Sequence, residues 1–121
     1  MISVEEILSD IRSDRTKKVI LDTDTFNEID DQYALAYCYL SDKIDLLSVN
    51  AAPFYNDRSE GYEDGMLKSY DEIHKVLGLV DPDYRTPVYH GSRTTIEASG
   101  AAVDSEAARN IINTVHASDE T

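Results

Sequence analysis

The sequence has little of what several protein classes require. Its only cysteine, Cys38, lies in an apolar stretch, so an internal disulfide and a cysteine-built metal site are both excluded. It has no run of about 18 apolar residues, the length that a membrane-spanning helix needs. Its start, MISVEEILSDIRSD, mixes acidic and apolar residues and lacks the pattern of a secretory leader. We therefore expect a soluble cytoplasmic protein with no membrane partner, in which Cys38 is a small core residue.

Basic residues are also scarce. The chain has 24 Asp and Glu against 11 Lys and Arg, a net charge of -13, which repels phosphate backbones and anionic lipid surfaces. Nucleic acid is therefore not an expected partner. Acidic side chains usually form a solvated surface, but carboxylates that gather in one place attract hard cations such as Ca²⁺ and Mg²⁺. The length of 121 residues suits one domain, over residues 1–121.

Hydrophobic periodicity predicts alternating helices and strands. Helical spacing predicts helices over residues 4–11, 31–40, 66–77 and 106–115, and short apolar runs predict strands over residues 19–21, 44–49 and 86–89. The first strand is expected to be buried on both faces, and Gly78 is placed to end the third helix with a left-handed cap. This alternation predicts an α/β fold with an open, mostly parallel sheet and flanking helices. In such folds the loops at the carboxyl ends of the strands form the ligand crevice.

An acidic segment follows the first predicted strand. The stretch VILDTDTFNEIDDQYALAY places five carboxylates within ten residues: Asp22, Asp24, Glu28, Asp30 and Asp31. Like charges this close raise one another's pKa values unless a cation offsets the repulsion. Calcium, which takes six to eight oxygen ligands from flexible loops, is the first expectation and magnesium the second. A purely structural role stays open, because acids also cap turns and satisfy helix N-termini.

The same residues resemble the opening of the inosine-uridine preferring nucleoside hydrolase family. In that family the first strand runs into a calcium-binding D-x-D-P-G-x-D-D loop, and Asp22-Thr23-Asp24 and Asp30-Asp31 match its two halves. Residues 25–29 form a spacer two residues longer than the family's P-G-x, similar to a divergent subgroup reading D-T-D-x-x-N-E-I-D-D. Asn56 closes a loop after the second strand as the family's ribose-contacting Asn does, and residues 87–92, PVYHGS, are similar to its P-V-x-x-G stretch.

The resemblance implies a nucleoside N-ribohydrolase, a glycosidase that cleaves the N-glycosidic bond of a purine or pyrimidine ribonucleoside. Asp24 and Asp31 would ligate calcium, with Asp22 orienting them. Asp30 would take a proton from the calcium-bound water, the general-base step of such a reaction. Asn56 would contact the ribose. The inserted Asn27 would contact substrate or hold the turn of the loop.

The resemblance covers only the N-terminal part of the family. A further calcium-binding Asp, a carbonyl ligand and a leaving-group His come from later regions of the family, so we expect an N-terminal fragment with an incomplete site. None of the three histidines here has an evident partner in the sequence. An open sheet edge would also favour a homo-oligomer.

Two other functions remain open. One is a catalytically inert calcium-binding fragment or oligomerising module. The other is a magnesium-dependent phosphatase that uses a strand-ending D-x-D, in which Asp22 would attack phosphorus. That class expects Thr or Val where Phe26 stands.

Overall fold

A computed structural model of the chain describes residues 2–118. Its strands are β1 (Lys17–Thr23), β2 (Ile44–Ala51) and β3 (Val88–His90), which form one parallel sheet in the order β1-β2-β3. Helix α2 (Ile29–Leu40) connects β1 to β2, and helix α3 (Tyr62–Val80) connects β2 to β3. The predicted α/β class, with an open parallel sheet and flanking helices, is confirmed.

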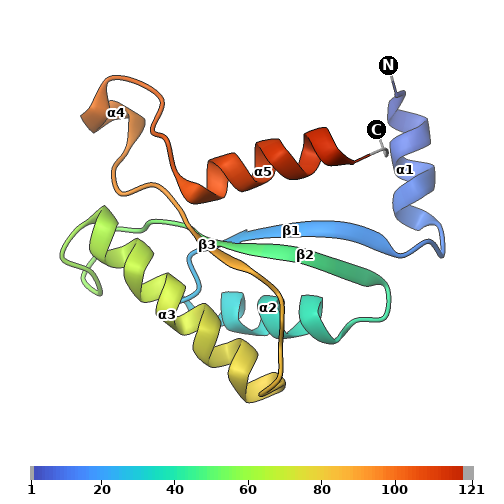
Figure 1. Cartoon of the computed structure of the whole chain (residues 1–121), viewed down its shortest axis with the longest axis horizontal. Coiled ribbons are helices and arrows are strands. Elements are labelled where there is room, and N and C mark those ends of the chain that lie inside the picture. Colours follow the sequence, from blue (N-terminus) through green and yellow to red (C-terminus); the bar gives the residue numbers. More distant parts are fainter. Residues whose placement is uncertain (1, 119–121) are drawn as a thin grey trace.

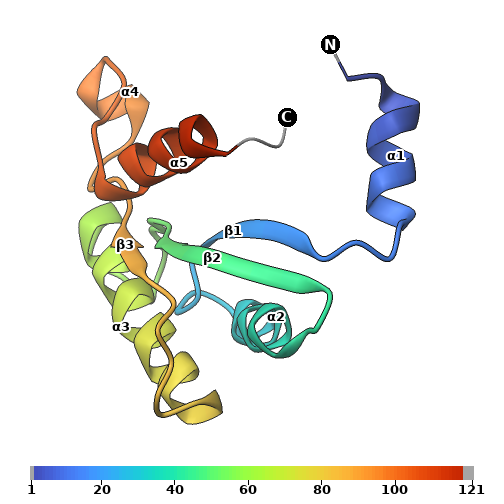
Figure 2. The same cartoon turned by 45° about the vertical axis from the view of Figure 1, so that its right-hand side comes forward.

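The helices cover the two faces of the sheet unequally. Helices α2 and α3 lie against each other below the sheet, whereas α5 (Glu106–Ala117) crosses above it (Figure 1). Helix α1 (Val4–Arg12) stands beyond the start of β1, as the turned view in Figure 2 makes clear. The short helix α4 (Ile96–Ser99) lies in the connection from β3 to α5 and was not predicted. Within residues 2–118 no helix is both long and apolar enough to span a membrane.

The hydrophobic core lies between the sheet and the α2 and α3 layer. Fully buried apolar side chains from these elements form one cluster: Leu35, Val49, Ala51, Met66, Ile73 and Leu77. Burying a large aliphatic side chain stabilises the fold by about 1.5–3 kcal/mol, so this layer contains the main apolar contribution. The opposite face has no comparable cluster among the described residues.

Glycines permit two close backbone approaches around this core. A Cβ on Gly65 of α3 would lie 2.0 Å from the Phe54 carbonyl oxygen, and a Cβ on Gly91 would lie 2.2 Å from the Ala51 carbonyl oxygen. The Gly91 N–H also donates to that same Ala51 oxygen at 3.0 Å. Only glycine leaves room for backbone at these distances. The glycine after β3 therefore lets the chain turn directly against the end of β2.

Three local predictions were wrong. Helix α3 continues through Gly78 to Val80, and among residues 2–118 Gly100 is the glycine with a positive φ. The helix ends there because Asp81 precedes a proline, which disfavours helical backbone, and Asp81 is extended. The strand residues 19–21 are only half-buried, and Ile20 faces an open groove between α1, α5 and the sheet. Cys38 is likewise half-buried and not a full core residue.

Candidate functional site

The predicted site residues lie where β1 and β2 end. Because parallel strands end at the same edge of a sheet, the loops after β1 and β2 are neighbours. Side chains alternate between the faces of a strand, so Asp22 and Thr23 point to opposite sides. Asp22 lies in register with Asn50, on the side of α5, and Thr23 faces α2. The acidic segment is thereby divided between the two faces of the sheet.

A hydrogen-bonded chain joins the two loops through Asn27. The Asn27 backbone N–H donates to the Asp24 carbonyl at 2.7 Å, and its Nδ2 donates to Asp24 Oδ2 at 2.9 Å. On its other side, Asn27 Oδ1 accepts from Asn56 Nδ2 at 2.6 Å. Arg58 Nη1 donates to the Asn27 carbonyl at 2.6 Å, and the Arg58 N–H donates to Asn56 Oδ1 at 2.9 Å. Asn27 therefore holds the turn of its own loop and links a predicted calcium ligand to the predicted ribose contact.

Buried hydroxyls position Asp31 on the other side of the strand. The Thr23 hydroxyl, on a side chain that is 4% exposed, donates to Asp31 Oδ1 at 2.6 Å. The Thr25 hydroxyl lies 3.0 Å from that of Thr23 and is fully buried. Asp30 and Asp31 both lie in the first turn of α2, as predicted, where the helix dipole favours negative charge. Asp31 is half-buried and held, whereas Asp30 is exposed to solvent.

Asp22 lies in a different environment, next to Asn50. Desolvation raises the pKa of the Asp22 carboxyl above its usual range although the residue is still exposed, and the Asn50 side chain lowers that pKa to a smaller extent. Asn50 is fully buried, and its Oδ1 accepts from Asn110 of α5 at 3.5 Å. Its Nδ2 forms no hydrogen bond of acceptable geometry with the described residues. Sequence reasoning missed Asn50, because only the strand register places it beside Asp22.

The structure does not gather all the predicted ligands at one point. It links Asp24, Asn27 and Asn56, and it holds Asp31 through Thr23. Across residues 2–118, no three His, Cys, Asp or Glu side chains are arranged so that they could hold a metal ion. The donor atoms that Asp24 and Asp31 offer are carboxylate oxygens, the type that calcium and magnesium prefer.

Comparison with family models, curated proteins and solved structures finds no match to this chain. The case for a function therefore depends on the residues and contacts described above.

Two histidines have partners that the sequence did not reveal. His90, at the end of β3, stacks on the Tyr70 ring with centroids 3.9 Å apart, and its Nδ1 lies 2.9 Å from Glu106 Oε2. The His90 hydrogen bonds hold the pKa of the Glu106 carboxyl below its ordinary value. His74 Nδ1 lies 2.5 Å from the Tyr84 hydroxyl. The His90 contacts join β3 to α3 and α5, and the His74 contact joins α3 to the connection before β3, so both histidines have structural roles.

Proposed function

We propose that this chain contributes the calcium-binding and ribose-binding part of a ribonucleoside hydrolase, which cleaves the N-glycosidic bond with water. The observation that carries this proposal is the hydrogen-bonded chain from Asp24 through Asn27 to Asn56. It joins a carboxylate from the loop after β1 to an amide from the loop after β2. Such a pair suits a ribose, because vicinal hydroxyls can bind a cation and also form hydrogen bonds with amide groups.

The donor chemistry of Asp24 and Asp31 fits a hard cation. Both side chains offer carboxylate oxygens, and the Thr23 hydroxyl donates to one oxygen of Asp31, as outer partners of metal ligands commonly do. When bound there, calcium would acidify a water molecule and orient the sugar hydroxyls. Two carboxylates supply fewer oxygens than the six to eight that calcium takes, so water or further protein groups would complete its coordination.

The other predicted residues have separate roles in this proposal. Asp30 is exposed at the start of α2, next to Asp31, where an ionised carboxylate can take a proton from water. Asn56 and Asn27 supply amide groups toward the ribose, and Arg58 holds both of them. Asp22 lies on the other face of the strand, beside Asn50, so it would support the loop through the backbone of β1.

Calcium titration by calorimetry tests the metal half of the proposal. The wild-type chain is expected to bind calcium, and Asp24→Ala is expected to weaken binding by about tenfold or more. Asp42→Ala, an exposed acid in the turn between α2 and β2, is the matched control and should bind as the wild type does. Equal binding by Asp24→Ala and the wild type would contradict the assignment.

Release of reducing sugar from inosine, uridine and a nitrophenyl riboside tests the reaction. Turnover that needs calcium and is lost in Asp30→Asn would support the hydrolase, whereas calcium binding without turnover would support the inert calcium-binding module. Magnesium-dependent phosphatase activity that disappears in Asp22→Asn would overturn the hydrolase proposal in favour of a phosphatase.

A further inference from the structure

Strand β1 has an open edge. Within residues 2–118 it pairs only with β2. The Lys17 N–H donates to the Lys43 carbonyl at 2.9 Å, and the Thr23 carbonyl accepts from the Ala52 N–H at 2.8 Å. Backbone groups of successive strand residues point alternately to the two sides. Since residues 17 and 23 face β2, residues 18, 20 and 22 turn their N–H and C=O groups toward the open edge.

The face of the sheet beside this edge is incompletely covered. An open groove of about 910 Å³ lies between α1, α5 and the sheet, and its floor includes Lys18 and Ile20. Its walls carry aliphatic side chains, including Ile11, which is 64% exposed, and Val115, which is also 64% exposed. An open strand edge beside an apolar surface is a site for pairing with another strand.

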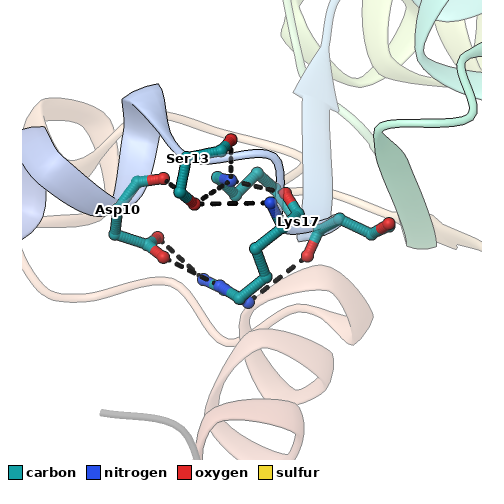
Figure 3. Close-up of polar contacts among 5 residues, drawn as sticks. Asp10, Ser13 and Lys17 are labelled. Atoms are coloured by element: carbon teal, nitrogen blue, oxygen red, sulfur yellow. Dashed lines mark hydrogen bonds and ion pairs between the residues drawn. The ribbon is translucent and has the colours of Figure 1, made fainter.

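Polar contacts hold α1 at the start of β1, so this open region is part of the fold. Lys17 Nζ donates to the Ser13 carbonyl at 3.1 Å and to the Arg15 carbonyl at 2.5 Å (Figure 3). Arg15 also forms a two-bond ion pair with Asp10 near the end of α1, with distances of 2.8 and 2.7 Å. These contacts connect the last turn of α1 to β1 through the linker of residues 13–16, while no residue of α1 is buried.

We propose that two copies of this chain pair through their β1 strands, antiparallel and centred on Ile20, to form a six-stranded sheet. The charges on this strand are self-complementary, so they favour a second copy of the same chain as the partner and Ile20 as the centre of the pairing. With Ile20 opposite Ile20 of the second copy, Lys18 lies opposite Asp22 of the second copy, and the twofold symmetry makes the pair twice. All three positions turn their backbone groups toward the open edge, so they form hydrogen-bonded pairs.

Other symmetric registers are less favourable. Pairing centred on Lys18 or on Asp22 would place two like charges opposite each other, which destabilises a strand pair. Pairing centred on Val19 or Leu21 would place a charged side chain opposite Ile20. Lys18 already has an interaction within its own chain, and its ammonium carries three donors, so it can bind a second carboxylate as well. This inference does not depend on the proposed hydrolase activity.

Charge exchange with mixing tests both the surface and the register. Lys18→Glu alone and Asp22→Lys alone each create two repulsive pairs, so each is expected to weaken dimerisation in sedimentation equilibrium by about tenfold or more. An equimolar mixture of the two variants restores two attractive pairs and is expected to form a heterodimer. Lys43→Glu and Asp71→Lys make the same charge changes at exposed positions away from β1, in the turn before β2 and on α3, and they should dimerise as the wild type does.

Cysteine cross-linking provides a second measurement that needs no charge change. In a Cys38→Ser background, Ile20→Cys places two cysteines in a hydrogen-bonded pair with Cα atoms about 5.5 Å apart, within disulfide range. Asp45→Cys on β2 is the control, since two β2 strands would lie about 14 Å apart across the dimer. A strictly monomeric wild type, single variants that dimerise normally, or equal cross-linking of the control would each overturn the proposal.

Discussion

Replacing Thr23 by valine tests whether the buried hydroxyl pair holds Asp31. Valine keeps the shape of threonine but removes the hydroxyl that donates to Asp31 Oδ1 at 2.6 Å and lies 3.0 Å from that of Thr25. A hydrogen bond to a charged group contributes about 1.5–3 kcal/mol, and leaving the Thr25 hydroxyl buried without this partner adds to the loss. We therefore expect Thr23→Val to lower the free energy of unfolding by about 2–3 kcal/mol.

Urea denaturation followed by circular dichroism measures this change, and at about 4 °C per kcal/mol the melting temperature should fall by about 8–12 °C. Thr16→Val is the matched control, because Thr16 is exposed just before β1. It should change the stability by less than about 0.5 kcal/mol. A loss below about 0.5 kcal/mol in Thr23→Val would refute the reasoning. Unchanged calcium affinity in that variant would separately show that Thr23 does not orient a metal ligand.

Two further predictions concern the packing of α3 and the titration of Asp22. Gly65→Ala should destabilise the fold by more than about 2 kcal/mol in urea denaturation, because its Cβ would lie 2.0 Å from the Phe54 carbonyl oxygen. Gly61→Ala is the control: a Cβ there meets no atom within 4 Å, so the change should be nearly neutral. Burial raises the pKa of Asp22 in the folded chain, so its contribution to stability falls as the pH rises from its unfolded pKa through the folded one. At protein concentrations too low for the proposed dimer to form, Asp22→Asn should therefore be more stable than the wild type at pH 7, with the difference shrinking at acid pH. A pH-independent difference would contradict this.

Hydrophobic periodicity in the sequence predicted much of the fold. Helical and strand periodicity placed the main helices and all three strands, and their alternation indicated a parallel sheet with the acidic loop at its carboxyl edge. Asp30 and Asp31 were placed at the start of a helix, as the structure has them. Helix α3 runs past Gly78 because a glycine only weakens a helix, whereas Pro82 disfavours helical backbone at Asp81 and ends it.

By itself the sequence determined the α/β class, the loop that carries the acids and the position of those acids relative to strand and helix, because these depend on contacts between near neighbours. The tertiary structure alone decided which side chains meet. The strand register placed Asp22 beside the buried Asn50, and the adjacency of two loops joined Asn27 to Asn56 across 29 residues. The alternation of the strand then separated Asp22 from Asp31, and the strand order β1-β2-β3 left β1 at an edge of the sheet. These contacts and the position of β1 depend on packing between segments that are distant in the sequence, so local sequence patterns do not predict them.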